Sequence, residues 1–233
     1  MYFDWTYLYL VLPCMILAMI ASAGVNKTFQ KYATQYSRKQ LTGAQAAQQV
    51  LQANGVSGVR IERVGGNLTD HFDPKSNVIR LSDSVYNSTS TAAIGVACHE
   101  AGHAVQYATH YAPIKLRAAI IPVTNIGSRL AMPLILLGIL FNFLGDLSYT
   151  FVYIGIACFG LSFVFQLVTL PVEFNASHRA TQAIDQQGIL TAEELKGARK
   201  TLSAAAMTYV AATAVALVQL LRLIIIFGRR RNH

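Results

Sequence analysis

The sequence is short of charged residues, acidic ones above all, and of cysteine, and each shortage excludes a class of protein. Asp, Glu, Lys and Arg make up 13% of its 233 residues, whereas soluble domains carry about 25%. The three cysteines, at Cys14, Cys98 and Cys158, are odd in number and give no disulfide framework of a small secreted domain. With 53% hydrophobic residues, the composition is that of a membrane protein.

The charge that is present is mainly basic. The chain has 11 acidic and 19 basic residues, so its formal net charge is +8. In a membrane protein such an excess indicates polar loops beside lipid headgroups. No module that combines aromatic and basic residues for nucleic-acid recognition is visible. We therefore expect the lipid bilayer as a partner, and no nucleic acid.

Four apolar runs are long enough, at about 20 residues, to cross a bilayer. They lie at Trp5–Ala23, 118–144, Tyr149–Leu170 and Ala204–Phe227. The first follows Met-Tyr-Phe-Asp rather than the basic segment of a signal peptide, which favours an uncleaved anchor. The second contains two prolines and Arg129, so we expect an interfacial first part and a true span from about Leu130. Pro171 is expected to end the third run.

The first polar segment predicts a small α/β region. Its apolar periodicity and its turn residues predict a helix at Thr42–Asn54, strands at Val56–Arg63 and Asn77–Ser82, and a helix from a Ser/Thr cap at 88–91 to Tyr107.

Two interpretations fit the second strand of this segment, which contains Val78, Ile79, Arg80 and Leu81. It is either an unpaired edge that binds an extended substrate by strand addition, or an ordinary interior strand. His71 precedes it, and is either a hydrogen-bond donor to a transition state or a plain surface residue.

The motif with the clearest chemistry lies in Ala97–Gln106, ACHEAGHAVQ, which contains His-Glu-x-x-His. On a helix, His99 and His103 lie on one face and can bind one Zn²⁺, and Glu100 can serve as general base towards water. Cys98 is either a further ligand or a small buried thiol. Because it points about 100° away from His99 on a helix, the buried thiol is favoured.

A catalytic zinc usually has three protein ligands, so a third is missing. His110 is one residue too far from His103 for the pattern HExxHxxGxxH. Glu193 and Glu194 belong to a predicted capping box that begins at Thr191. Glu62 lies in a predicted strand and stays open as a candidate.

Glu173 is the predicted third ligand. The second and third apolar runs form a hairpin, which returns Glu173 to the membrane side of the His-Glu-x-x-His helix. The alternative is an acidic residue favoured by the start of a helix. Ser177, one turn later, or Asn175 could orient a ligand, and His178 and Arg179 could stabilise an oxyanion or lie on a plain helix surface.

Four stretches together resemble the YugP-like bacterial membrane zinc metallopeptidases: DHFDP from Asp70, VIRLS from Val78, ACHEAGHAVQ from Ala97 and LPVEFNAS from Leu170. With the four apolar runs, the resemblance covers nearly the whole chain, and it implies zinc on His99 and His103 with Glu100 catalytic. HtpX-type membrane proteases are more distantly similar. Their third-ligand motif is Glu-x-x-x-Asp, in which Glu173 matches the Glu and Ser177 departs from the Asp.

The expected fold is a mainly α membrane protein with about four transmembrane helices and a small α+β zincin-like region that carries the HExxH helix and a short sheet. The predicted boundaries give a first transmembrane helix (1–24), the catalytic region (25–117), a second membrane segment (118–147), a third transmembrane helix (148–170), a third-ligand helix with a helical connector (171–203), and a fourth transmembrane helix with a basic tail (204–233).

These features predict a zinc-dependent endopeptidase of the bacterial cell membrane that acts on membrane-associated or unfolded polypeptides. A non-catalytic scaffold or metal sensor with a retained zinc site is the alternative, and a four-span transporter is a third. Four spans place both polar segments on one side, which carries ten basic residues near the spans: Lys27, Lys31, Arg38, Lys39, Lys115, Arg117, Arg179, Lys196, Arg199 and Lys200. The other side has Arg229, Arg230 and Arg231, so the positive-inside rule favours a cytoplasmic catalytic side.

Overall fold

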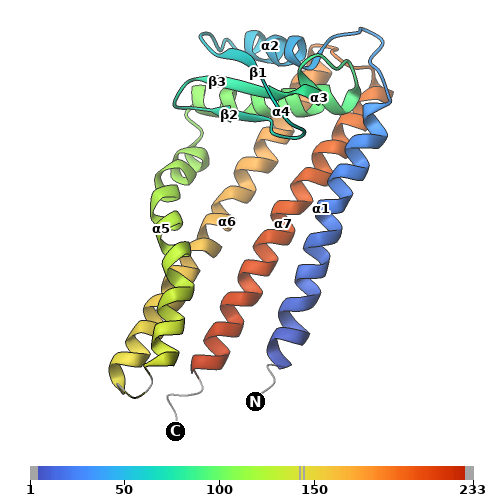
Figure 1. Cartoon of the computed structure of the whole chain (residues 1–233). Helices are drawn as coiled ribbons and strands as arrows, with labels where there is room; N and C mark the ends of the chain where they lie inside the picture. The colour runs from blue at the N-terminus through green and yellow to red at the C-terminus, as the bar shows by residue number, and fades with distance from the viewer. Residues whose placement is uncertain (1–4, 142, 144, 229–233) are drawn as a thin grey trace. The chain divides into compact units, whose positions relative to one another are not determined.

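A computed structural model describes residues 5–141, 143 and 145–228 (Figure 1), so the predicted basic tail at 229–231 lies outside the described residues. The chain is a mainly α membrane protein with a small three-stranded sheet. Its described part holds four helices long and apolar enough to cross a bilayer. These are η1 (Tyr7–Val11) continued by α1 (Leu12–Ala33), α5 (Ala112–Leu140), α6 (Asp146–Gln186) and α7 (Ala192–Gly228).

The long helices continue past the positions where the sequence predicts breaks. The helix that contains the third run does not break at Pro171, which lies inside α6. The division of the chain into two compact units nevertheless falls between Leu170 and Pro171, where the sequence predicts the run to end. A proline inside a helix costs about 3 kcal/mol. Burial of Val172, Ala176 and Ala180, which follow it on one face of the helix, offsets that cost. Likewise α7 is one helix, and the predicted separation near 203 is absent from it.

The chain forms two compact units. The apolar unit consists of Met1–Ile20, Leu116–Leu170 and Thr208–His233, and the polar unit consists of Ala21–Lys115 and Pro171–Met207. All four chain crossings between the units lie inside the long helices.

The polar unit begins with α2 (Gly43–Ala53). Thr42 caps it as predicted, in a capping box with Gln45. Two further helices follow, α3 (Asp83–Tyr86) and α4 (Thr91–Ala108), and the side chain of Ser90 caps α4 by accepting from Ala93 N–H. A second capping box joins Thr191 and Glu194 at the start of α7, as the sequence predicts.

The sheet has the order β1-β3-β2, with strands β1 (Arg60–Val64), β2 (His71–Asp73) and β3 (Val78–Ser82). β3 pairs in parallel with β1 and antiparallel with β2. The edge interpretation of Val78, Ile79, Arg80 and Leu81 is therefore wrong, and the interior-strand alternative is correct. The sequence did not predict β2, whose three residues are too few to show a period.

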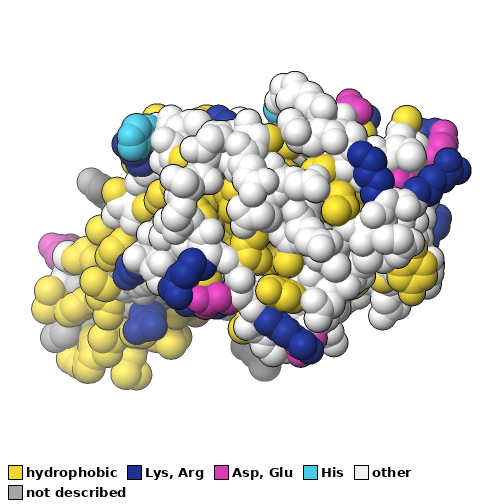
Figure 2. Space-filling view, turned by 90° about the horizontal axis from the view of Figure 1, so that it is seen from above, with side chains coloured by type: hydrophobic (Ala, Val, Ile, Leu, Met, Phe, Trp, Pro, Cys, Tyr) yellow, Lys and Arg dark blue, Asp and Glu magenta, His cyan; other side chains and the backbone are white. Residues whose placement is uncertain are grey.

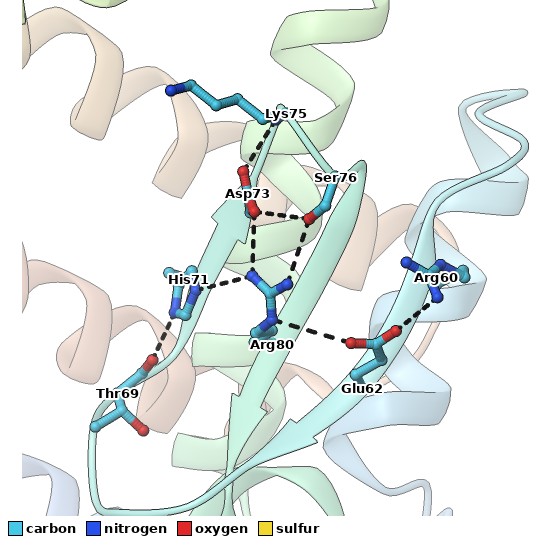
Figure 3. A network of polar contacts seen from close by, with 8 residues as sticks. All are labelled: Arg60, Glu62, Thr69, His71, Asp73, Lys75, Ser76 and Arg80. Atoms are coloured by element: carbon cyan, nitrogen blue, oxygen red, sulfur yellow. Dashed lines mark hydrogen bonds and ion pairs between the residues drawn. The ribbon is translucent and has the colours of Figure 1, made fainter.

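A polar network covers one face of the sheet (Figure 3). Arg80 lies at its centre, 3.2 Å from the Asp73 carboxylate and 3.9 Å from that of Glu62. Arg80 also donates to Nε2 of His71 at 3.5 Å. The opposite face of β2 carries Phe72, whose ring packs edge-on against Tyr107 of α4. The sheet thus has one hydrogen-bonded polar face and one face on the helix of the His-Glu-x-x-His motif.

Most residues of α4 are buried, and small residues bring its neighbours close. An added Cβ on Gly95 would lie 3.2 Å from the Ala198 Cα of α7, and one on Gly102 would lie 2.7 Å from the Ala176 carbonyl oxygen of α6.

On the face seen in Figure 2, basic side chains form separate small groups, several of them beside acidic ones.

Candidate metal centre

Two helices of the polar unit bring three side chains together. His99 and His103 come from α4, and Glu173 comes from α6. Oε2 of Glu173 lies 3.3 Å from Nε2 of His99 and 3.6 Å from Nε2 of His103. Within the part of the chain that the structure describes, this is the one group of His, Cys, Asp and Glu whose ligand atoms all lie close enough, within 4.8 Å, to hold a metal.

These spacings fit a tetrahedral zinc ion. Bonds of about 2.0–2.2 Å from zinc to nitrogen and oxygen separate neighbouring tetrahedral ligand atoms by roughly 3.3–3.5 Å. The two nitrogen–oxygen distances, 3.3 and 3.6 Å, are close to that range. Two imidazoles and one carboxylate are also the ligand set of catalytic zinc sites, which keep the fourth position open.

The place of Glu173 in its helix removes the alternative explanation for it. That alternative required a helix starting at this residue, but α6 begins at Asp146 and passes through Glu173 without a break. A carboxylate in the helix interior gains nothing from the helix N-terminus. Glu173 is only 4% exposed, so it needs polar partners, and His99 and His103 supply them.

Glu100 lies beside His99 on α4 and is 8% exposed. Burial of the His103 ring acts to lower its pKa. The hydrogen bond with Glu173 and the negative charges of Glu100 and Glu173 act in the opposite direction and outweigh burial, so the pKa of His103 is raised. Burial also raises the pKa of Asp70, and the nearby charge of Glu100 acts in the same direction. The negative field at the two histidines attracts a cation.

Gln106 sets the proton position on His103. The Val172 carbonyl oxygen can only accept a hydrogen bond, so the Gln106 amide nitrogen, 2.8 Å away, donates to it. This turns Oε1 of Gln106 toward Nδ1 of His103 at 2.9 Å. Because Oε1 only accepts, Nδ1 of His103 donates, and Nε2 keeps the lone pair that a metal needs.

The orientation of Gln106 is itself supported from α6. Its amide nitrogen also donates to Oδ1 of Asn175 at 3.0 Å, and Nε of Arg179 donates to the same oxygen at 2.8 Å. The Arg179 guanidinium lies over the Tyr111 ring, 5.9 Å from its centroid. Arg179, predicted as an oxyanion donor, is thus engaged in positioning Asn175.

Ser177 gives His99 the corresponding support. Its Oγ lies 3.1 Å from Nδ1 of His99. With the lone pair of His99 Nε2 directed at the metal group, Nδ1 carries the proton and donates to Ser177. The serine that departs from the Glu-x-x-x-Asp pattern therefore lies beside a predicted ligand, and it is one of the two residues that the sequence suggested could orient a ligand.

Gly102, inside His-Glu-x-x-His, permits the approach of α6. An added Cβ would meet the Ala176 carbonyl oxygen at 2.7 Å, a separation that real Cβ atoms do not show. Ala176 lies between Glu173 and Ser177 in α6, so the close approach at Gly102 brings both of them to the histidines.

Other candidates lie elsewhere. His71 is in the sheet network, where Nδ1 faces the Thr69 carbonyl oxygen at 2.8 Å and Nε2 faces Arg80. His178 is exposed, and at 100° per residue it lies about 140° around α6 from Glu173. Glu62 is paired with Arg60 at 2.9 Å. Cys98 is fully buried, and burial raises the pKa of its thiol, in agreement with the buried-thiol interpretation.

Sequence reasoning missed three contributors: Gln106, Gly102 and Asp70. Gln106 follows His103 by three residues and therefore lies on the same helix face, which is a usable signal. The requirement at Gly102 depends on a second helix some seventy residues away, and no local pattern reveals it. Asp70 accepts from the amide of Ser82 at 2.7 Å, and this contact lies beyond the range of a helix or strand period.

The fold and the site together define a membrane protein with a zinc-peptidase type of metal centre. Residues 7–228 match the family described as "Putative neutral zinc metallopeptidase", and the chain belongs to that family. A relative in Bacillus subtilis (strain 168), named "Putative membrane protease YugP", is 44% identical over 228 residues, which cover 97% of this chain and 99% of the relative. The family resemblance is thereby confirmed. No solved structure matches.

Proposed function

We propose that this protein is an endopeptidase that hydrolyses peptide bonds of membrane-associated or unfolded polypeptides with zinc on His99, His103 and Glu173. The observation that carries the proposal is the convergence of the Nε2 atoms of His99 and His103 on the buried carboxylate of Glu173. Glu100 follows His99 directly in the sequence. The family and the relative support a zinc protease, and the ligand set is our own assignment.

The residues divide the work as follows. A zinc ion, which His99, His103 and Glu173 would hold, would supply Lewis acidity toward water and a peptide carbonyl. Glu100 accepts a proton from the attacking water and delivers it to the amine nitrogen as the C–N bond breaks. Gln106 and Ser177 keep Nε2 of both histidines unprotonated and correctly oriented.

The substrate class follows from the position of the third ligand. Glu173 lies three residues after Leu170, where the apolar run of α6 ends. A cleavage site at that depth favours chains that lie at the membrane surface, or chains unfolded enough to reach it. Any substrate that extends the sheet would pair with β1 or β2, since both edges of β3 are occupied.

The decisive test compares Glu100→Gln with wild type in the purified full-length protein. We expect Glu100→Gln to keep its zinc by elemental analysis and to lose cleavage of fluorescent casein by about 10²–10⁴-fold, the usual contribution of a general base. Glu193→Gln is the matched control, because that glutamate is exposed and paired with Lys196 outside the site. A chelator should abolish cleavage and added zinc should restore it. Unimpaired proteolysis by Glu100→Gln would refute the mechanism, and zinc-loaded wild type without any hydrolysis would favour the non-catalytic scaffold or sensor.

We also propose that the catalytic side is cytoplasmic, from the ten basic residues that flank the spans on that side. In a chain whose three native cysteines are replaced, a cysteine added at the C-terminus should react with an impermeant reagent in intact cells. Labelling only after lysis would reverse the orientation.

A further inference from the structure

A pocket with a volume of 430 Å³ lies between α1 and α7 within the polar unit. Its described lining combines two ammonium groups, two hydroxyl groups, one phenol ring and one thioether: Lys31, Lys200, Thr28, Ser203, Tyr32 and Met207. No carboxylate is among these lining residues. None of them belongs to the metal centre, so the pocket is a separate feature of the molecule.

The two cations of this pocket have no counter-ion among the described residues of the protein. Among the residues that the structure describes, neither Lys31 nor Lys200 forms an ion pair. One turn earlier on α7, by contrast, Lys196 is paired with Glu193 at 2.8 Å. The ammonium group of Lys31 lies 5.4 Å from the centroid of the Tyr32 ring, a cation–π contact that holds it at the pocket wall.

On both helices, the pocket lies where the apolar part of the helix meets its charged part. On α1 the apolar run ends at Ala23, and Thr28 and Lys31 follow within about two turns. On α7 the charged residues end at Lys200, after which Arg222 is the sole charged residue before Gly228. In a membrane protein this boundary coincides with the headgroup layer. Met207, 51% exposed and one turn from Ser203 on the apolar side, offers a surface for an acyl chain.

The walls of the pocket are held in place without a ligand. Gly197 of α7 packs so closely on α1 and α4 that an added Cβ would lie 2.6 Å from Thr91 Oγ1 and 2.8 Å from the Tyr32 ring. The Thr91 hydroxyl donates to the Tyr32 carbonyl oxygen at 3.3 Å. Because Thr91 is the first residue of α4, the pocket wall is joined to the start of the helix that carries His99.

We propose that this pocket binds the phosphate headgroup of an anionic phospholipid. Lys31 and Lys200 supply the two positive charges, Thr28 and Ser203 donate hydrogen bonds to phosphate or glycerol oxygens, and the acyl chain follows Met207 along α7. Basic pockets between membrane helices recognise such headgroups, and each lysine near an anionic surface adds to the attraction. The proposal is independent of peptidase activity, because binding alone tests it.

The experiment is a lipid titration of the purified full-length protein in neutral detergent. Native mass spectrometry counts bound lipids, and a thermal-shift assay measures stabilisation, for phosphatidylglycerol against phosphatidylcholine at physiological salt. The pocket variant is Lys31→Gln/Lys200→Gln. The matched control is Lys27→Gln/Lys196→Gln, which removes the same charge from the same two helices outside the pocket lining.

We expect phosphatidylglycerol to bind and to stabilise wild type and the control alike, and its apparent affinity to fall by about tenfold or more in the pocket variant. Lys31→Arg/Lys200→Arg should retain binding, and equal zinc content in all variants shows that the fold is intact. An equal loss in both glutamine pairs would overturn the proposal, because diffuse charge would then explain the attraction. Inorganic phosphate that stabilises as well as the lipid would overturn the lipid assignment, and so would equal binding of phosphatidylcholine.

Discussion

The polar unit contains two clusters of acidic and histidine side chains, and they serve different ends. In the sheet network of Figure 3, Asp73 and Glu62 face Arg80, and His71 has a partner at each ring nitrogen. At the metal centre, Glu173 faces the Nε2 atoms of two histidines, and their Nδ1 atoms are occupied by Gln106 and Ser177. An arginine in the first cluster already neutralises the carboxylates. In the second cluster three possible ligand atoms, two imidazole nitrogens and one carboxylate oxygen, lie within 4.8 Å of one another, and this geometry supplies a place for a metal ion.

Burial separates the clusters as clearly as their partners do. The side chains of His99, His103 and Glu173 are 15%, 10% and 5% exposed, whereas those of Arg80 and Glu62 are 30% and 41% exposed. Solvent screens the surface pairs, which therefore contribute little to stability. Electrostatic interactions at the buried group are screened much less, so loss or gain of a metal there should have a large effect.

Replacing Glu173 should have the largest effect. In Glu173→Ala the metal loses one of three proposed ligands, and we expect zinc affinity to fall by more than about 100-fold, since removing only a hydrogen-bond partner of a ligand costs about 10–100-fold. Glu62→Ala, which removes a carboxylate from the sheet network, should leave zinc content unchanged. Elemental analysis after dialysis measures both, and a fully loaded Glu173→Ala protein would eliminate this ligand.

Separating the two helices of the site should come next. Gly102→Ala places a methyl group 2.7 Å from the Ala176 carbonyl oxygen, so α6 must shift, at a cost of about 1–3 kcal/mol. We expect weaker zinc binding and reduced casein cleavage together. Gly24→Ala is the control, because nothing lies within 4 Å of an added Cβ there. Equal behaviour of the two alanine variants would show that the close approach is not required.

Removing the support of a histidine should cost less. Gln106→Leu deprives Nδ1 of His103 of its acceptor, and we expect zinc affinity to fall by about 10–100-fold while the protein remains folded. Ser177→Ala should lower the zinc affinity less than Gln106→Leu does, because a water molecule can replace the single contact that the serine hydroxyl makes with His99. Competition with a chromogenic chelator gives the affinities. Wild-type affinity in Gln106→Leu would mean that another group fixes the His103 tautomer.

Disrupting the sheet network should have the smallest effect. The Ser76 hydroxyl, the Lys75 amide and the Arg80 guanidinium hold the pKa of Asp73 below its usual range. A carboxyl group with a lowered pKa in the folded state adds stability above its unfolded pKa of about 4 and loses it as the pH falls further. Arg80→Gln should therefore lower the thermal midpoint by no more than a few degrees at pH 7 and reduce the acid sensitivity below pH 4. Zinc content should not change, and a loss of zinc would mean that the two clusters are coupled.

The sequence predicted the parts of this protein that depend on local patterns. The His-Glu-x-x-His helix, a cap for it within the Ser/Thr run at 88–91 and the capping box at Thr191 follow from residues within a few positions of one another. The proposed ligand Glu173 was reached by an argument about membrane topology. The continuation of α6 through Pro171 could not be read locally, because burial of residues beyond the proline decides it.

For contacts between segments that lie far apart along the chain, the sequence prediction was either wrong or missing. The pairing of β3 on both sides depends on β2, a strand of three residues without a recognisable period. The roles of Gln106 and Gly102 depend on contacts between α4 and α6, and neither residue type alone indicates such a contact.

The crossings between the two units have a practical consequence for anyone who wishes to excise a water-soluble fragment. They fall inside α1, α5, α6 and α7, so no loop offers a cutting point. Truncation there would create new helix ends with unsatisfied backbone groups. A fragment beginning at Pro171 would place Glu173 third from its frayed terminus. The hydrolytic machinery is therefore best purified with its lipid-soluble part attached.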